Sequence, residues 1–290
     1  MKLSQIYHSL YDEWNIGFMA VDAGILNTNV PEIKWMRHRY KDRWFADPQI
    51  LSIDNGIIKV LVEEFVFSRD IGQIALLNVD MATYELIGRK EILSLPTHLS
   101  FPQVLRYNNK VFIYPENGES RELWLYEYDI DRDELTGKKI LLSDTSLADA
   151  TILPFDKTKM LATSSAPNGN VMDILCWDDN AKKYVICDSY TFIENVARNA
   201  GPCFQMGDRW IRPAQVSNHS YGEALELQEI IMEDDGGMRF NALCRWHSPH
   251  PTHTLSFHNF CVHDRIAAVD CRGYRYWFSK HLESMLAKLR

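Results

Sequence analysis

Five segments of the chain share one outline, and this repeat constrains the fold more than any other feature of the sequence. In each copy a small or polar turn leads into an apolar strand, and a polar turn then leads into a second apolar strand that ends in polar residues. The copies align on Pro48, Pro102, Ala150, Pro202 and Ser256. A step of about 50 residues made of strands alone is typical of β-propeller blades, in which each repeat is one small sheet.

The turns and the third strands support this interpretation. Asp54-Asn55-Gly56 and Asn108-Asn109 separate the first two strands of their copies, and these residue types accept the positive φ angles of tight hairpins. A sandwich with chance spacing is the alternative, but its strands do not recur as a four-strand unit. We predict an all-β fold, one five-bladed propeller domain over residues 1–290. Its blades are expected near residues 45–80, 98–130, 147–180, 197–232 and 252–278.

The two ends of the chain have separate expectations. The run Trp14–Val21 is β-rich, and we expect it to join the last blade and close the ring, since closure removes exposed sheet edges. Residues 279–290 carry Leu282, Leu286 and Leu289 at helical spacing, which predicts a short C-terminal helix.

Charge and hydropathy exclude several classes of partner. The net charge of −8 argues against sequence-independent binding to nucleic acid or to an anionic membrane, both of which need a basic surface. The one dense basic run, Arg37–Arg43, is interpreted as a solvated loop. No stretch approaches the ~18 apolar residues of a membrane span, and Met1–Leu10 lacks the pattern of a secretory signal. We expect a cytoplasmic protein with no membrane span.

Cysteine and histidine spacings do not predict a metal site. The six cysteines contain no Cys-x-x-Cys pair and match no zinc pattern, so we expect reduced, buried thiols. His247, His250 and His253 are evenly spaced, but Pro249 and Pro251 keep that stretch irregular. No glycine-rich phosphate loop is present, and no cofactor is expected.

Acidic residues recur where propeller blades begin. Asp47 and Asp149 stand just before the alignment position of the first and third copies, and Glu116 ends a second strand. These positions converge at one mouth of a propeller channel, and paired carboxyl groups flanking a glycosidic bond are the machinery of sugar cleavage. We predict Asp47, Asp149 and Glu116 as catalytic. Their alternative role is structural, because Asp often caps a turn through its own backbone.

A second group of residues is predicted to contact the substrate from the same mouth. The arginines in it suit carboxylate or phosphate groups, so the expected ligand is a glycan, a sugar phosphate or a glycolipid. The His and Arg side chains have the alternative of bonding one blade to the next. The group comprises Trp44, Glu64, His98, Arg198, Arg212, Gln215 and His253.

The blade openings resemble a known group of enzymes. Ala46-Asp47-Pro48 and Ala148-Asp149 look like those of the five-bladed propellers of glycoside hydrolase families 43 and 32. The resemblance implies that the first-blade Asp acts as general base or nucleophile. It implies that the third-blade Asp orients substrate, and that a fourth-blade Glu before Gly-Pro is the general acid.

A closer resemblance covers residues 14 to 275. Trp44-Phe45-Ala46-Asp47-Pro48, His98-Leu99-Ser100-Phe101-Pro102, Pro115-Glu116 and Arg212-Pro213-Ala214-Gln215 are similar to the propeller domain of glucosamine inositolphosphorylceramide transferases and of related bacterial proteins linked to surface polysaccharides. It implies a carbohydrate-active enzyme that cleaves or transfers a glycosyl group.

One departure from the hydrolase pattern leaves alternatives open. The fourth copy has Ala200-Gly201-Pro202 where the hydrolases carry Glu before Gly-Pro, so their general acid is missing from its usual place. A glycan-binding propeller without catalysis is therefore the main alternative, and a protein-interaction propeller is a further one. We also expect Arg198 and Arg212, brought together by a hairpin, to keep Glu116 and Asp149 ionised.

Overall fold

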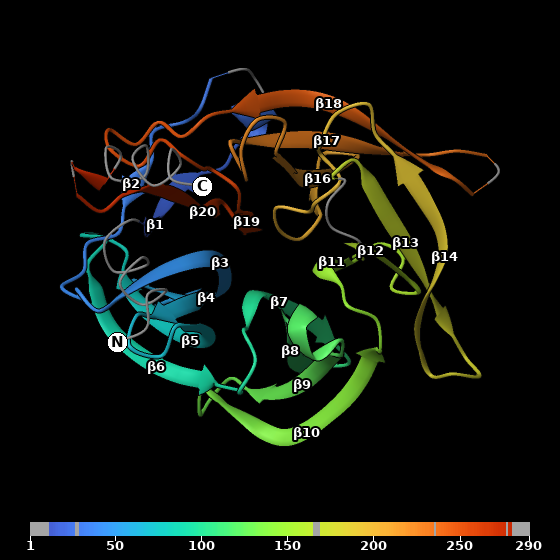
Figure 1. Cartoon of the computed structure of the whole chain (residues 1–290), viewed down its shortest axis with the longest axis horizontal. Helices are drawn as coiled ribbons and strands as arrows, with labels where there is room; N and C mark the ends of the chain where they lie inside the picture. Colours follow the sequence, from blue (N-terminus) through green and yellow to red (C-terminus); the bar gives the residue numbers. More distant parts are fainter. Residues whose placement is uncertain (1–11, 27–28, 165–168, 235, 277, 280–290) are drawn as a thin grey trace, which may run out of the picture.

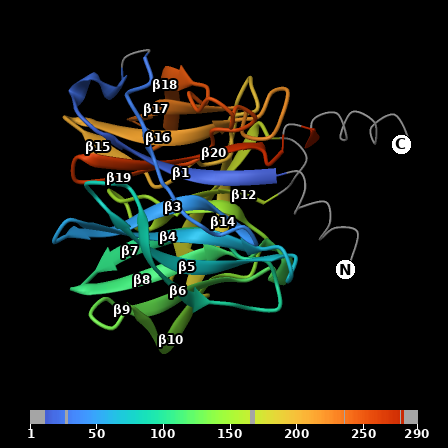
Figure 2. The same cartoon turned by 90° about the vertical axis from the view of Figure 1, so that its left-hand side faces the viewer.

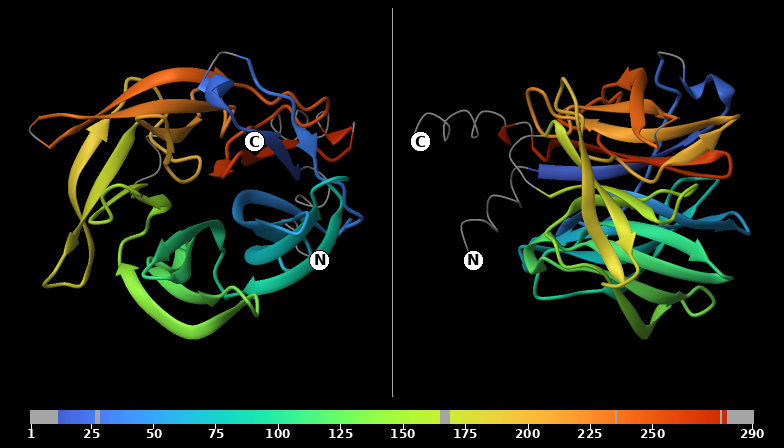
Figure 3. Two further views of the ribbon diagram at one scale, coloured as in Figure 1. Left: turned by 180° about the vertical axis from the view of Figure 1, so that it is seen from behind. Right: turned by 90° about the vertical axis from the view of Figure 1, so that its right-hand side faces the viewer.

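The computed structural model describes residues 12–26, 29–164, 169–234, 236–276 and 278–279. Within them, five four-stranded antiparallel sheets are arranged around a common axis (Figures 1 and 3). The chain is thus an all-β, five-bladed propeller, as its repeat predicts. The helix predicted for residues 279–290 falls almost entirely outside the described residues.

Four blades are continuous in sequence and run from an innermost to an outermost strand. The first blade has β3 (Arg43–Asp54), β4 (Ile57–Val66), β5 (Ile71–Asp80) and β6 (Leu86–Leu93). The second has β7 (Ser100–Tyr107), β8 (Lys110–Glu116), β9 (Leu123–Asp129) and β10 (Glu134–Ser143). The third has β11 (Ala148–Ile152), β12 (Lys159–Thr163), β13 (Val171–Asp178) and β14 (Lys183–Thr191). The fourth has β15 (Phe204–Met206), β16 (Arg209–Val216), β17 (Ala224–Met232) and β18 (Met238–Trp246).

The fifth blade combines both ends of the described chain. Its strands are β19 (Phe260–His263), β20 (Ile266–Tyr274), β1 (Asp12–Ala20) and β2 (Lys34–Trp35), in that order. β1 pairs with β20 along its whole length, from Asp12 opposite Tyr274 to Ala20 opposite Ile266. Figure 2 shows the two strands side by side.

The outermost strands lie beyond the ends of the predicted blade ranges. In β10, for example, most side chains between Glu134 and Lys139 are exposed. An outer strand packs on few neighbours, so its sequence lacks the apolar run that marks the middle strands. The two short 3-10 turns, η1 (Ala23–Leu26) and η2 (Gly118–Ser120), are the helical segments among the described residues up to Tyr276.

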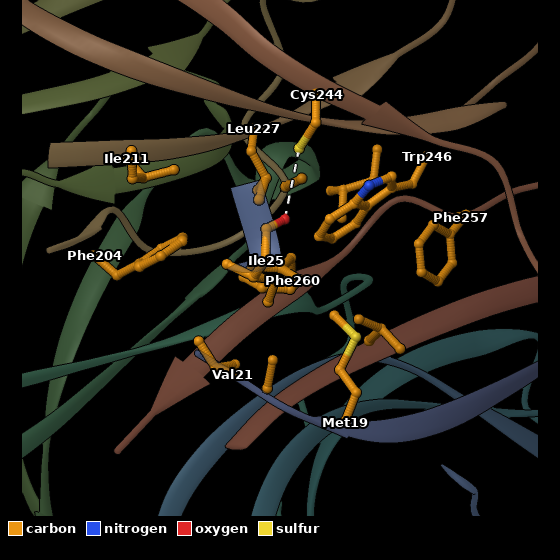
Figure 4. Packing of buried hydrophobic residues seen from close by; sticks show 14 of the residues in the cluster. Met19, Val21, Ile25, Phe204, Ile211, Leu227, Cys244, Trp246, Phe257 and Phe260 are labelled. Carbon is orange, nitrogen blue, oxygen red and sulfur yellow. Dashed lines mark hydrogen bonds between the residues drawn. The ribbon is translucent and has the colours of Figure 1, made fainter. Parts of the chain in front are cut away.

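The hydrophobic core is divided into layers between neighbouring blades. One layer, between the fourth and fifth blades, packs Phe204 and Leu227 against Trp246, Phe257 and Phe260 (Figure 4). Four further clusters fill the other interfaces between adjacent blades. Because both faces of each sheet are covered, the middle strands carry apolar runs, and Val60 to Val62 in β4 are all buried.

The innermost strands are irregular at one shared place. The pairing register of β3, β7 and β11 shifts near Asp47, Phe101 and Asp149, and all three residues have positive φ, between 43° and 51°. Such bulges bend a strand and redirect its side chains. Aspartate tolerates this left-handed conformation better than most residues, which suits two of the three positions.

The cysteines differ in part from the expectation of reduced, buried thiols. Cys176 and Cys187, on neighbouring strands β13 and β14, form a disulfide with a Cα–Cα distance of 5.8 Å. The prediction that all cysteines are reduced is therefore wrong for this pair, whereas Cys203, Cys244 and Cys261, for example, are free and buried.

Among the described residues, no helix combines the length and apolar character needed to cross a lipid bilayer.

Candidate functional site

A cavity of about 460 Å³ opens where the five innermost strands begin, and we call it the mouth cavity. Every blade contributes to its wall. Six of the residues predicted from the sequence line it: Trp44, Asp47, His98, Glu116, Asp149 and Arg198. The wall also contains Trp14, Ala46, Glu63, Ser100, Tyr221, His258 and Arg272.

Asp47 is held at the bulge of β3 by the neighbouring blades. Its Oδ2 accepts a hydrogen bond from the backbone N–H of Phe101 at 2.9 Å, and its own N–H donates to Oδ2 of Asp270 at 2.9 Å. Burial raises the pKa of the Asp47 carboxyl well above its ordinary value; His258 opposes the rise and the Glu63 charge adds to it. This carboxyl therefore holds a proton more readily than a solvated aspartate does.

Glu116 and Asp149 form a connected pair across two blades. The Asp149 N–H donates to Oε2 of Glu116 at 2.8 Å, while Oδ2 of Asp149 accepts from Nε of Arg198 at 2.5 Å. Burial, and then the charge of Asp149, raise the pKa of Glu116 to about 7, although Arg198 acts in the opposite direction. The expectation that nearby cations keep Glu116 ionised is therefore wrong, because burial and a like charge outweigh one arginine.

Arg198 presents a cation to the cavity. Its guanidinium lies 5.2 Å from the ring centre of Tyr221, in addition to the Nε bond to Asp149. The side chain is about a quarter exposed. Arg198 lines the cavity, where a guanidinium suits a carboxylate or phosphate.

His98 and Glu63 form a second charged pair in the wall. Nε2 of His98 lies 3.0 Å from Oε1 of Glu63, and Nδ1 accepts the N–H of Gly72 at 3.1 Å. Burial lowers the pKa of His98, but the hydrogen bond and charge of Glu63 outweigh burial and raise it to about 9. Charging the ring requires Nδ1 to give up the Gly72 bond, so the two contacts compete.

His258 connects Asp47 to a buried acid. Its Nδ1 lies 2.9 Å from Oδ1 of Asp270, and its Nε2 lies 3.8 Å from Oδ1 of Asp47. In the described part of the chain, these three side chains have ligand atoms close enough to hold one metal ion, within 4.8 Å of one another. Asp270 already accepts hydrogen bonds from the backbone N–H groups of Asp47 and Asn259, so its carboxylate oxygens have fewer lone pairs left for a metal ion. The absence of a metal stays a prediction.

One wall of the mouth cavity is aromatic. Trp44 stacks on Phe65 with ring centres 4.8 Å apart, and Trp14 lies 6.2 Å from Trp44 and 4.4 Å from the His258 ring. Nε1 of Trp44 is buried without a hydrogen-bond partner among the described residues.

Four residues predicted to contact substrate do not line this cavity. Glu64 is fully buried and bonds to Arg43 and Arg89, whereas its neighbour Glu63 faces the cavity. Gln215 is also buried, and its Nε2 donates to Oδ2 of Asp149 at 3.1 Å, which makes it a support for that carboxylate.

Arg212 and His253 also lie elsewhere. Arg212 is completely buried and donates to Oδ1 of Asn199 at 2.7 Å, to Oε1 of Gln228 at 2.6 Å and to backbone carbonyls. A direct substrate contact does not fit this position, because the Arg212 side chain lies on the buried side of β16, away from the mouth cavity. His253 packs against His250, with ring centres 4.3 Å apart.

Sequence reasoning missed His258 because Ser256 does not correspond to Pro48. Ser256 bridges to Arg272 before the bulge, as Ala46 pairs before it in the first blade, and pairing resumes at Phe260 as it does at Gln49. Counted back from these last two residues, His258 corresponds to Asp47, whereas alignment of Ser256 with Pro48 puts Leu255 at the mouth. The available signal was Asp270 in the partner strand β20, an acid that lies opposite the bulge and contacts His258.

Solved structures with the same fold include enzymes that act on sugars. The chain superimposes on a β-xylosidase with a TM-score of 0.56 at 11% identity, over 82% of this chain and 87% of that one. It superimposes on a GH43_1 enzyme from Xanthomonas citri complexed with xylose with a TM-score of 0.52 at 11% identity, over 76% and 79% of the two chains. At these identities the similarity concerns the fold alone.

Sequence comparison gives the family. The chain is 27% identical over 204 residues to glucosamine inositolphosphorylceramide transferase 1 of Oryza sativa subsp. japonica, covering 66% of this chain and 27% of the rice protein. It thus spans about a quarter of that relative's length. The family model described as glucosamine inositolphosphorylceramide transferase 1, N-terminal, matches residues 40–236, more than half of the chain. The protein belongs to this family.

Proposed function

We propose that the mouth cavity cleaves or transfers a glycosyl group, in the metabolism of a surface polysaccharide or a glycolipid. The observation that carries the proposal is the convergence of Asp47, Glu116 and Asp149 on one cavity, with a pKa of about 7 for Glu116. A carboxyl group that keeps its proton near neutral pH is suited to protonate a leaving-group oxygen.

The three carboxyl groups have different roles in this proposal. Glu116 is the general acid, in place of the fourth-blade glutamate of the hydrolases. Asp47 is the general base or nucleophile, and His258 favours its ionised form against the effect of burial. Asp149 positions the other groups, because its N–H bonds to Glu116 and its carboxylate bonds to Arg198.

The wall chemistry supports a sugar substrate that carries an anionic group. Trp14 and Trp44 offer apolar ring faces to the C–H face of a sugar, and Arg198 offers a fork to a carboxylate or phosphate. The name of the rice relative, glucosamine inositolphosphorylceramide transferase 1, contains a sugar and a phospholipid, and this supports a glycan or glycolipid substrate.

The experiment is a turnover screen with mass-spectrometric detection. Purified protein is incubated with aryl glycosides and with extracted glycans and glycolipids, and released or transferred sugar is measured. Asp47→Asn and Glu116→Gln are compared with Asp80→Asn, a turn carboxylate outside the cavity. Turnover that both site variants lose and the control retains supports the proposal, and turnover unaffected by either site variant contradicts it.

A second candidate function is glycan binding without catalysis, and Ala200 is the observation in its favour. This residue stands where the hydrolases carry their acid, before Gly-Pro, and it is completely buried, so the position supplies no acid to the cavity. Calorimetry with Asp47→Asn separates the candidates. An enzyme loses turnover and keeps glycan affinity, whereas a binding module has affinity and no turnover to lose.

A further inference from the structure

A second cavity lies at the opposite end of the innermost strands, and we call it the far cavity. It has a volume of about 280 Å³ and receives residues from all five blades. Gln49 of β3 and Gln103 of β7 belong to it, each two residues beyond the bulge residue of the mouth cavity. At a rise of about 3.3 Å per residue, the two cavities are separated by only a thin layer.

The far cavity has the opposite charge character from the mouth cavity. Its described lining contains no Asp or Glu, whereas four carboxylates line the mouth cavity. Arg106 and Lys157 stand at its edge and each donates to a backbone carbonyl, of Leu51 and Pro154 respectively. Neither is in an ion pair with a described residue. In a chain of net charge −8, two cations without a protein counter-ion beside an acid-free cavity favour an anionic ligand.

The interior of the far cavity offers uncharged polar groups. Oε1 of Gln49 is buried without a hydrogen-bond partner among the described residues, which leaves part of this carboxamide unsatisfied. The Tyr114 hydroxyl accepts the N–H of Ile152 at 3.1 Å and retains its own proton for donation. Apolar walls come from side chains such as Val104 and Phe204. Polar groups within and cations at the edge suit a small molecule that has hydroxyl groups at one end and an anionic group at the other.

We propose that the far cavity binds a small phosphorylated polyol, such as a monosaccharide phosphate. The phosphate lies at the edge that carries Arg106 and Lys157, and the hydroxyl groups face the polar interior that includes Tyr114 and Gln103. A volume of 280 Å³ corresponds to about nine water molecules at ~30 Å³ each, which is room for one monosaccharide. This site is separate from the proposed catalytic centre, and neither proposal depends on the other.

The test uses isothermal titration calorimetry with glucose 6-phosphate, with glucose and inorganic phosphate as comparison ligands. We expect glucose 6-phosphate to bind more tightly than inorganic phosphate, and glucose to show no measurable heat. A variant with both Arg106→Gln and Lys157→Gln should bind at least about tenfold more weakly, because charge-assisted hydrogen bonds contribute about 1.5–3 kcal/mol. Lys182→Gln, an exposed turn cation outside the cavity, is the matched control and should bind normally.

Two further variants locate the binding site. Val104→Phe fills the far cavity without removing charge and should also abolish binding of glucose 6-phosphate. Arg198→Gln alters the mouth cavity instead and should leave the binding of glucose 6-phosphate unchanged. Circular dichroism confirms that each variant is folded. The proposal is overturned if the wild-type protein does not bind glucose 6-phosphate, or if the double variant binds it normally. Loss with Arg198→Gln and retention in the double variant would assign the ligand to the mouth cavity and also overturn it.

Discussion

The backbone N–H of Asp149 donates a hydrogen bond to Oε2 of Glu116 at 2.8 Å, which ties the end of one blade to the bulge of the next. The same bond holds two carboxyl groups close together, and their mutual repulsion is one cause of the raised pKa of Glu116. The geometry that joins the blades therefore also sets the protonation of the site.

Glu116 should determine the alkaline limb of the activity profile. Burial and the Asp149 charge raise its pKa to about 7, so the protonated form is lost as the pH rises through 7. We expect turnover to fall above pH 7, and Glu116→Gln to reduce turnover by about 10²- to 10⁴-fold and to remove the pH dependence in this range. A pH–rate profile measures both effects. Glu134→Gln in the same blade is the control, and an alkaline limb that survives in Glu116→Gln would reject the assignment.

The protonation of His98 should depend on Glu63. Burial disfavours the charged ring, and the contact with Glu63 reverses that preference to give a pKa of about 9. In Glu63→Gln, burial and the Gly72 N–H remain and favour the neutral ring, while only the weaker charges of Glu116 and Asp47 still favour the charged one, so the pKa should fall clearly below 9. NMR titration of the His98 ring protons measures the change. The adjacent variant Glu64→Gln provides a comparison, and an unchanged His98 pKa in Glu63→Gln would contradict the pairing.

Arg198 and Arg212 should respond differently to substitution although they belong to the same blade. Arg198→Ala should weaken binding of an anionic glycan by about tenfold and leave a neutral glycan almost unaffected, since one charge-assisted contact is lost. Arg212→Ala should instead destabilise the protein by about 3–5 kcal/mol, because its buried partners lose their donors. Calorimetry measures the first effect and urea denaturation the second. Equal losses for both glycans with Arg198→Ala would remove its assigned role.

Gly201 should be irreplaceable in the fold. Its φ of 140° is a conformation that side chains rarely adopt, and an added Cβ would clash with the Phe260 carbonyl at 2.2 Å. We expect Gly201→Ala to cost more than about 3 kcal/mol or to prevent folding. Gly56→Ala, at a turn with φ of 75° and open space around the Cβ, should cost about 1 kcal/mol. Thermal unfolding compares the two variants, and similar melting temperatures would show that the backbone around Gly201 can relax.

The sequence predicts the blades well because strand pairs and turns recur along the chain, but it predicts side-chain direction poorly. Glu63 and Glu64 are neighbours in one strand, so they face opposite sides, and the pattern does not say which side is the cavity. For the same reason, the sequence predicts the position of Arg212 along its strand but not that its side chain is buried instead of facing the cavity. His258 is missed because Ser256, which the repeat alignment equates with Pro48, pairs before the bulge as Ala46 does, and only the three-dimensional pairing reveals this.

The pairing of β1 with β20 also bears on how this molecule folds. Asn15 and Cys271, which are in contact, are 256 residues apart in sequence. Contacts of such long range carry a large loop-closure entropy and slow the folding of β-rich proteins. During synthesis β1 must remain without its β20 partner until residues 266–274 have left the ribosome. The fifth blade is therefore completed last, and a chaperone that shields β1 in the interval would raise the yield of folded protein.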